Sequence, residues 1–241
     1  MAQRKDQYEL VPFEERQRKY KAALDEIAAL QKWGPKDFVT DREKLRKFYS
    51  IDKSSHIPAV PVAAVLPQTP ELVARVVAIC AKHKVPMTPR GAGTGLEGGC
   101  VPYAGGIVVD TARLSRLDID KDNSCVWVGA GVTKLQLSKA ALKVGLHFGP
   151  DPSSNPCVGG MVSTSGSGMS TLKYGTTREN VLSLKVVTPQ GKLFQTRQVV
   201  RKSSAGLELT HSCTWVAKVL WASSVKCASA SSLLPSTTPA P

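Results

Sequence analysis

A dense run of glycines lies between Pro89 and Pro102, and an arginine opens it. Five glycines fall within the nine positions from Gly91 to Gly99. Glycine allows positive φ and lets backbone N–H groups approach a ligand with no Cβ in the way, which is how loops wrap phosphate oxygens. Arg90 adds a positive charge and fixed-geometry donors for the same oxyanions. The stretch therefore predicts a phosphate-binding loop.

Two other interpretations fit this glycine loop less well. A flexible linker would be rich in Gly and Ser and would lack bulky anchors, whereas this loop holds Leu96 and Val101. The segment from Gly93 to Gly98 also matches the G-x-G-x-x-G pattern of nicotinamide dinucleotide sites. That pattern is credible only between a strand and a helix. Here Gly-Cys-Val-Pro follows Gly98, which argues against a Rossmann nicotinamide site.

A second stretch, rich in glycine and serine, runs from Gly149 to Gly168. The pair Gly159 and Gly160 stands where a helix is expected to begin. Unpaired N–H groups and the positive end of the helix dipole would there face an anion. The small residues that follow leave room for a flat ring. A surface loop of the same composition remains the alternative.

Both stretches resemble the flavin segments of the FAD-linked oxidases of the vanillyl-alcohol-oxidase type, whose cofactor domain is the PCMH-type FAD-binding domain. The first reads PRGAGTGLEGG with a following VP, most similar to the D-lactate dehydrogenase and glycolate oxidase branch. The second reads PDPSS and then GGM, and KYG continues it. The resemblance implies the following FAD contacts: Pro89, Arg90, Gly91, Ala92, Gly93, Thr94, Gly95, Pro150, Ser153, Ser154, Gly159, Gly160, Ser163, Ser165, Gly166, Gly168, Tyr174 and Gly175.

The resemblance also implies an activity. Flavin N5 would take hydride from the α-carbon of a small D-2-hydroxyacid, and the electrons would pass to an acceptor. Several enzymes of the superfamily tether flavin to a histidine at the place of Thr94, so FAD is expected to bind non-covalently here. Arg90 favours the lactate and glycolate enzymes over 2-hydroxyglutarate dehydrogenases, which tend to carry glutamine there.

One position departs from the family pattern inside the second stretch. Many relatives read T-N-A-S-G where this chain has Thr164-Ser165-Gly166-Ser167-Gly168. Ser165 can form a hydrogen bond, but it lacks the two N–H donors of an amide.

No catalytic or metal-binding residue is assigned. The four histidines are isolated in sequence, and the six cysteines form no C-x-x-C pair. Members of the family supply the substrate arginine and the general base from a C-terminal substrate domain, for which a chain that ends at Pro241 has no room. The alternative function is therefore a non-catalytic interaction protein that keeps the flavin-binding lobes. The histidines are His56, His83, His147 and His211.

Composition narrows the remaining functions. With 42% hydrophobic residues in 241, the chain can build a sizeable core. The net charge of +13 is dispersed, and its densest clusters, at 16–21 and 42–47, are interleaved with apolar residues at helical spacing. They predict solvated helix faces rather than a nucleic-acid partner. No apolar run reaches the roughly 18 residues of a membrane span, and no signal peptide or clear presequence is visible. We expect an intracellular protein, mitochondrial by family analogy, with the cytoplasm as the alternative.

The periodicities predict an α+β fold of two α/β lobes. Strand 62–66, a helix capped by Thr69 and strand 84–88 form a β-α-β unit that delivers the chain into the glycine loop. Further strands are expected at 106–110, 117–120 and 125–128, with a helix capped by Thr133 and a hairpin at 182–196. Before this domain, residues 12–31 predict one amphipathic helix, and Thr40-x-x-Glu43 predicts a capping box.

The expected organisation is a helical segment at 1–56, an incomplete PCMH-type domain at 57–211 and a tail at 212–241. After His211 the family continues to a flavin-contacting G-S-E-G-T-L-G motif, whereas Trp215 to Ala222 read WVAKVLWA. Back-translated and read from the third base of the Trp215 codon, the same bases can encode that motif. The sequence therefore predicts that residues from about Ser212 are out of frame. The Ser-, Ala- and Pro-rich end has the composition of a disordered segment.

Resequencing the gene across the codons for Leu209 to Ala222 tests this prediction. We expect the alternative frame to encode Gly-Ser-Glu-Gly-Thr-Leu-Gly and to stay open well beyond the present stop. A frame that lacks the motif, or that closes at once, would contradict the frameshift.

Overall fold

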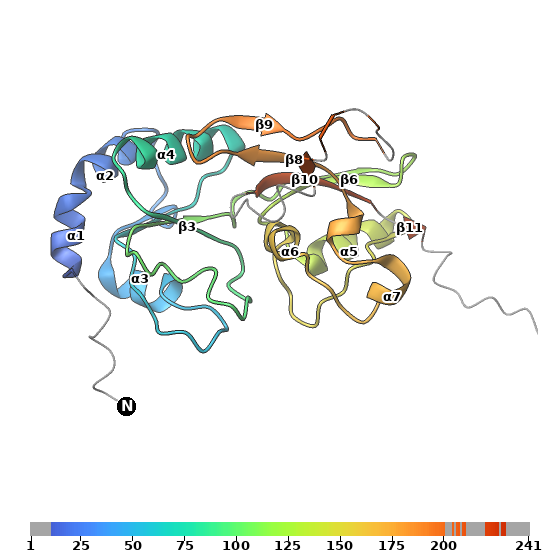
Figure 1. Cartoon of the computed structure of the whole chain (residues 1–241), viewed down its shortest axis with the longest axis horizontal. Helices are drawn as coiled ribbons and strands as arrows, with labels where there is room; N and C mark the ends of the chain where they lie inside the picture. The colour runs from blue at the N-terminus through green and yellow to red at the C-terminus, as the bar shows by residue number, and fades with distance from the viewer. Residues whose placement is uncertain are drawn as a thin grey trace, which may run out of the picture.

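The computed structural model describes residues 11–200, 204, 206–207 and 209–210, and the backbone of residues 220–226 and 228–229. The chain forms two lobes that lie side by side (Figure 1), as the sequence predicts. The helices are α1 (Phe13–Lys19), α2 (Lys21–Ala28), α3 (Arg42–Tyr49), α4 (Pro70–Lys82), α5 (Lys134–Lys143), α6 (Val158–Thr164), α7 (Thr171–Tyr174) and the 3₁₀ turn η2 (Arg178–Asn180). The strands are β1 (Phe38–Val39), β2 (Ala63–Val65), β3 (Met87–Arg90), β4 (Ile107–Asp110), β5 (Leu117–Asp120), β6 (Cys125–Gly129), β7 (Leu146–His147), β8 (Val181–Val187), β9 (Leu193–Gln195), β10 (Leu220–Lys226) and β11 (Ala228–Ser229).

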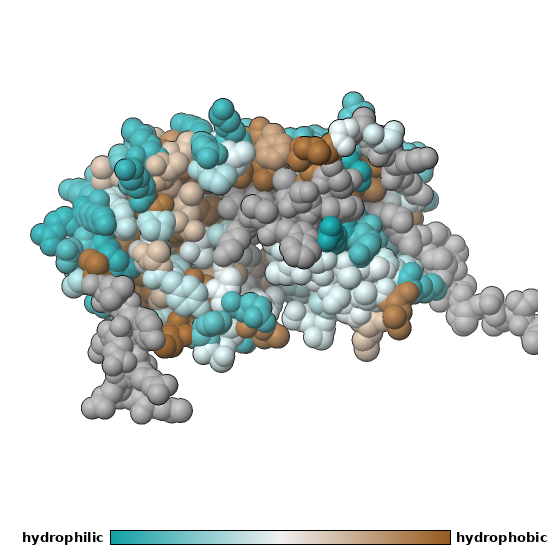
Figure 2. Space-filling model, in the orientation of Figure 1, coloured by the Kyte–Doolittle hydropathy of each residue, from teal (hydrophilic) through white to brown (hydrophobic). Residues whose placement is uncertain are grey.

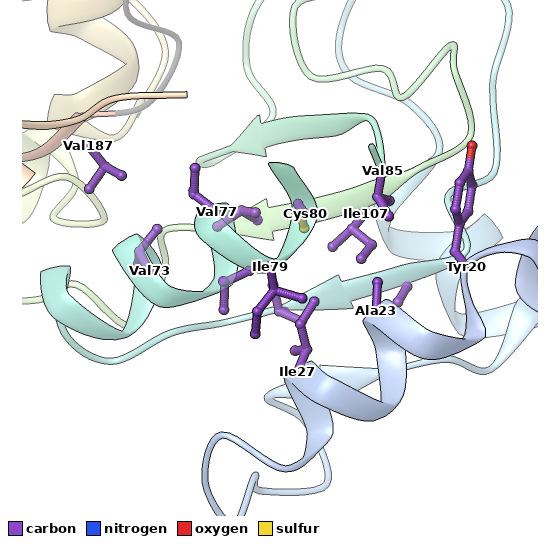
Figure 3. Packing of buried hydrophobic residues seen from close by; sticks show 14 of the residues in the cluster. Tyr20, Ala23, Ile27, Val73, Val77, Ile79, Cys80, Val85, Ile107 and Val187 are labelled. Atoms are coloured by element: carbon purple, nitrogen blue, oxygen red, sulfur yellow. The ribbon is translucent and has the colours of Figure 1, made fainter. Parts of the chain in front are cut away.

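The first lobe is built on a four-stranded sheet of order β1-β2-β4-β3. Strands β2 and β3 both pair in parallel with β4, while β1 pairs antiparallel with β2. The predicted β-α-β unit is present, and β4 lies between its two strands. Helices α2 and α4 pack on one face of the sheet through residues such as Ile27, Val73 and Ile107 (Figure 3).

The second lobe is an antiparallel sheet of order β5-β6-β10-β8-β9. Helices α5, α6 and α7 lie on one side of it (Figure 1). Phe148, Leu137 and Met161 fill the space between these layers. The β8–β9 hairpin reaches across to α4, and Val187 of β8 belongs to the core of the first lobe.

The single N-terminal helix predicted for residues 12–31 is wrong, because the helix breaks at Tyr20 into α1 and α2. Phe13 packs with Leu45 against Ala64 on one face of the first sheet. Tyr20 and Ile27 belong to the cluster on the opposite face. Successive strand residues point to opposite faces, so a straight helix cannot cover both.

The capping box predicted at Thr40 is also wrong. Helix α3 begins at Arg42, and its cap is Asp41, whose Oδ1 accepts a hydrogen bond from the Lys44 N–H at 2.9 Å. The predicted caps Thr69 and Thr133 are confirmed, since their hydroxyls accept from the backbone N–H groups of Leu72 and Gln136. Aspartate is a strong helix cap, and it starts this helix one residue later than expected.

The predicted disordered tail is corrected over residues 220–226 and 228–229. Leu220–Lys226 forms β10, the central strand of the second sheet, between β6 and β8. Without a strand there, the facing N–H and C=O groups of β6 and β8 would lack partners, and buried backbone groups are almost always paired. The rest of the predicted tail lies outside the described residues.

An ion pair fixes the chain segment that leaves β4. The Arg113 guanidinium donates through Nε to Asp37 Oδ1 at 2.8 Å, and its Nη2 lies 2.7 Å from the same oxygen. The Asp37 side chain is only 7% exposed, while that of Arg113 is 48% exposed. Asp37 follows α2 and precedes β1, the edge strand of the first sheet. The pair therefore ties the segment after β4, which carries Arg113, to that edge.

Replacing Arg113 with alanine should therefore lower the free energy of unfolding by roughly 2–3 kcal/mol, since it leaves a buried carboxylate without its partner. Arg116→Ala is the matched control, because Arg116 pairs with Asp118 on the surface, with side chains 63% and 57% exposed. Exposed pairs contribute about 0–1 kcal/mol. Urea unfolding of both variants measures the difference, and equal losses would contradict a structural role for the Asp37 pair.

Candidate flavin site

The two lobes join where the chain after β4 crosses the chain after β6. A Cβ built at Gly129 would lie 2.1 Å from the Leu114 carbonyl oxygen, and one at Gly131 would lie 2.0 Å from that of Thr111. The two backbones are hydrogen-bonded at the crossing, where the Gly129 N–H donates to the Arg116 carbonyl at 2.8 Å. The backbones can approach this closely only because neither glycine has a side chain.

A cavity of about 380 Å³ lies against this crossing, between the lobes. Figure 2 shows the surface notched between the lobes, with pale residues of intermediate hydropathy around the notch. Sites for small molecules and cofactors are commonly about 300–1,000 Å³. The lining residues that the sequence predicted are Pro89, Arg90, Gly91, Ala92, Gly93, Thr94, Gly95, Ser154, Gly159, Gly160, Ser163 and Gly166.

The glycine loop follows the carboxyl end of β3 and forms one wall. The Lys53 N–H donates to the Gly95 carbonyl at 3.2 Å, which supports the loop from behind. Within the described part of the chain, the N–H groups of Gly93, Thr94 and Gly95 donate to no protein acceptor. Adjacent unpaired N–H groups at a cavity wall are the arrangement that holds phosphate oxygens.

Helix α6 forms the opposite wall. It begins at Val158 with Cys157 as its N-cap, so Gly159 and Gly160 are its second and third residues. A Cβ at Gly159 would lie 2.7 Å from the Cβ of Ala130, so this glycine lets the helix pack on the lobe crossing. A Cβ at Gly160 would meet nothing within 4 Å, so the second glycine faces open space at the cavity.

Arg90 carries the positive charge of the lining. Its Nη1 donates to the Ile51 carbonyl at 2.9 Å, and its guanidinium lies 5.9 Å from the centroid of the Tyr49 ring. Burial raises the pKa of Tyr49 to about 12. Burial also raises the pKa of Asp110 to about 6, although the Ala112 N–H and the charge of Arg90 act in the opposite direction. Arg90 is thus held by carbonyl and aromatic groups, and the described residues place no carboxylate within ion-pair distance of it.

Two thiols line the cavity where the walls meet. Burial raises the pKa of Cys157 to about 11, with the Ala92 N–H acting in the opposite direction. Burial raises the pKa of Cys100 as well, opposed by Arg90 and the Gly91 N–H. Because the thiolate is the nucleophilic form, burial works against the reactivity of both thiols. Cys157, the N-cap of α6, lies against Gly91 of the loop.

Other residues implied by the resemblance lie outside the lining and have contacts within the fold. A Cβ at Gly168 would lie 2.3 Å from the Asp151 backbone, and the Tyr174 ring lies against Gly149 and 5.4 Å from the His147 ring. The residues outside the lining are Pro150, Ser153, Ser165, Gly168, Tyr174 and Gly175.

Ser165 caps the carboxyl end of α6 in the left-handed conformation, with φ of 52°. Its hydroxyl lies 3.0 Å from that of Thr176. Asparagine adopts this conformation more readily than most residues. An asparagine, which the family pattern places here, would therefore suit this backbone better than Ser165 does, and the structure gives no reason for the serine.

Sequence reasoning missed several lining residues, among them Asp52, Thr111 and Ala130. Thr111 and Ala130 belong to the lobe crossing, and Asp52 comes from the segment after α3. No motif marks these positions, because the topology alone brings them to the cavity. Other lining residues lie within the two predicted stretches but are not among the FAD contacts that the resemblance implies. In the loop they are Leu96, Glu97, Gly99 and Cys100, and in the second stretch they are Pro152, Pro156, Cys157, Met161 and Thr164.

Neither a metal cluster nor a membrane span is found in the described residues. No group of three or more His, Cys, Asp or Glu side chains could hold a metal ion there. No described helix is long and apolar enough to cross a membrane.

A comparison with known structures bears on the fold. Alkyldihydroxyacetonephosphate synthase matches with a TM-score of 0.75 over 87% of this chain and 41% of that chain, at 24% sequence identity. At this identity the likeness supports the two-lobed fold and nothing beyond it.

Sequence comparisons identify the family. Glycolate oxidase subunit GlcD of Bacillus subtilis is 36% identical over 75% of this chain and 39% of its own length. D-lactate dehydrogenase of Archaeoglobus fulgidus is 40% identical over 61% of this chain and 33% of its own length. The mitochondrial cytochrome D-lactate dehydrogenase of Arabidopsis thaliana is 34% identical over 79% of this chain and 34% of its own length. The chain thus spans less than half of each relative. A family model described as an FAD binding domain matches residues 61–197, more than half of the chain. The chain therefore belongs to the PCMH-type FAD-binding family, with D-lactate dehydrogenase and glycolate oxidase subunit GlcD among its relatives.

Proposed function

We propose that this chain is the FAD-binding portion of an FAD-linked D-2-hydroxyacid dehydrogenase similar to D-lactate dehydrogenase. The observation that carries the proposal is the single cavity walled by both predicted glycine segments. Unpaired N–H groups of the loop line one wall and Gly160 leaves the other open. Family membership supplies the identity of the cofactor.

The residues present fit a flavin dinucleotide. The N–H groups of Gly93, Thr94 and Gly95, together with the charge of Arg90, suit the pyrophosphate. Gly160 leaves space for a flat or bulky group along α6, because an added Cβ would meet nothing within 4 Å. When bound, FAD would supply the acceptor for a hydride from the α-carbon of the 2-hydroxyacid, and an electron acceptor would reoxidise it.

The proposal extends to the setting of the complete enzyme. The relatives from Arabidopsis thaliana and Danio rerio are named as mitochondrial proteins, while other relatives come from bacteria or archaea. We therefore favour a mitochondrial location by analogy, with the cytoplasm as the alternative. The substrate and the acceptor would bind with parts that the relatives carry beyond the region matched here.

The first test is flavin binding by the purified chain. We expect FAD to bind close to one per chain, with flavin absorbance bands, and to leave with the supernatant on acid precipitation, because Thr94 cannot form the histidine tether. A chain that takes up no FAD would contradict the proposal and support the interaction protein. Flavin that stays with the precipitate would contradict non-covalent binding.

The second test separates blocking the cavity from damaging the fold. Gly160→Val should abolish flavin retention and leave the urea midpoint of the flavin-free chain nearly unchanged, because its side chain extends into open space. Gly159→Ala is the matched control, and it should lower the stability of the flavin-free chain by about 1–3 kcal/mol through overpacking against Ala130. Gly93→Val should also abolish retention, but its clash with Arg90 disturbs the loop as well. Wild-type FAD affinity in Gly160→Val would contradict the placement of the site.

The third test concerns the substrate. The chain read in the alternative frame from about Ser212 should oxidise D-lactate or glycolate faster than D-2-hydroxyglutarate, because Arg90 stands where 2-hydroxyglutarate dehydrogenases tend to carry glutamine. Steady-state kcat/KM for the three acids measures this. A clear preference for D-2-hydroxyglutarate would overturn the assignment.

A further inference from the structure

Asp52 is a buried carboxylate that the fold only half satisfies. The residue is 7% exposed and lines the cavity. Its Oδ1 accepts a hydrogen bond from the Ser54 N–H at 2.9 Å. Its Oδ2 is buried and has no hydrogen-bond partner within the described residues. A buried charged oxygen without a partner is costly, so the missing donor is expected from a ligand in the cavity.

The surroundings keep this carboxylate ionised. Burial raises the pKa of Asp52, but hydrogen bonding to Ser54, the nearby Cys100 N–H and the charge of Arg90 outweigh it, so the pKa is lowered. An ionised carboxylate accepts hydrogen bonds and donates none. It repels phosphate oxygens and attracts hydroxyl groups, and hydrogen bonds to a charged partner are the strong ones.

The position of Asp52 beside the glycine loop limits which ligand groups can reach it. The next residue, Lys53, donates its N–H to the Gly95 carbonyl, so the carboxylate stands next to the unpaired N–H groups of the loop. In a flavin dinucleotide the groups on either side of the pyrophosphate are polyhydroxylated, the ribityl chain on one side and the ribose on the other. Phosphates held by the loop would bring one of these sugars to Asp52.

We propose that Asp52 Oδ2 accepts a hydrogen bond from a ribityl or ribose hydroxyl of the bound dinucleotide, so that Asp52 orients the sugar next to the loop-bound phosphates. The inference rests on the proposed FAD site. The proposal assigns different ligand groups to different parts of the cavity wall. Loop N–H groups and Arg90 select for phosphate, and Asp52 selects for a hydroxyl beside it.

Isothermal titration of FAD into wild type, Asp52→Asn and Asp122→Asn tests the proposal. Asparagine keeps the acceptor for the Ser54 N–H but replaces the charged oxygen, so FAD should bind at least about tenfold more weakly. Asp122 is an exposed carboxylate in the turn between β5 and β6 and does not line the cavity, so Asp122→Asn is the matched control and should change the Kd less than about threefold. Without flavin, Asp52→Asn should unfold at the same temperature as wild type or higher, because it removes an unsatisfied charge. A residue that only supports the loop would give the opposite pattern, a lower unfolding temperature with an unchanged FAD Kd.

Ligands that lack hydroxyls provide a second test, which needs only the wild-type chain. Riboflavin is compared with lumiflavin, which has no ribityl hydroxyls, and ADP with 2′,3′-dideoxy-ADP. The proposal expects a loss of about tenfold in one of the two pairs, and that pair identifies the sugar. Equal affinities within both pairs, or equal FAD affinities for wild type and Asp52→Asn, would overturn it. If wild type binds FAD normally, such a result leaves the FAD site intact and removes only the role of Asp52, whereas a wild type that binds no FAD removes both.

Discussion

The structure depends on the close backbone crossing at Gly129 and Gly131. A Cβ added at Gly129 or Gly131 would lie 2.1 Å or 2.0 Å from a carbonyl oxygen of the chain after β4, which is closer than any side chain tolerates. The crossing brings the end of the parallel sheet against the end of the antiparallel sheet. The glycine loop after β3 and helix α6 are thereby placed on opposite walls of one cavity. Gly91 and Gly159 continue this close contact, since added Cβ atoms would meet Cys157 and Ala130.

Glycines serve two different purposes in this site. Those at the crossing remove bulk so that protein packs on protein, and their replacement would disturb the fold. Gly160 and Gly95 have nothing within 4 Å of an added Cβ, so they remove bulk where a ligand is expected. The charges are divided in a similar way, because Arg90 stands beside unpaired N–H groups and Asp52 offers one unsatisfied oxygen. The cavity thus has polar groups at defined points and small side chains or glycines elsewhere, which suits a long cofactor with phosphate, sugar and ring parts.

Much of this arrangement could be predicted from local sequence. The hairpins, the Thr69 and Thr133 caps and the β-α-β unit follow from residue patterns that act over a few positions. The break at Tyr20 could not be predicted, because it depends on which face of a distant sheet Phe13 and Ile27 cover. Composition also failed for Leu220–Lys226, since the unpaired edges of β6 and β8 place a strand there. In the site, both glycine segments were found from their sequence, whereas Asp52, Thr111 and Ala130 come together only through the topology.

Hydrogen exchange of the backbone amides, measured by mass spectrometry with and without FAD, tests most directly whether the two glycine segments form one flavin site. The account predicts that FAD slows exchange in peptides covering Arg90–Gly95 and in peptides covering Cys157–Thr164, with the same dependence on FAD concentration. The surface hairpin β5–β6 should be unaffected at its tip. Protection of only one segment, or half-saturation at different FAD concentrations for the two, would contradict a single site built by both lobes.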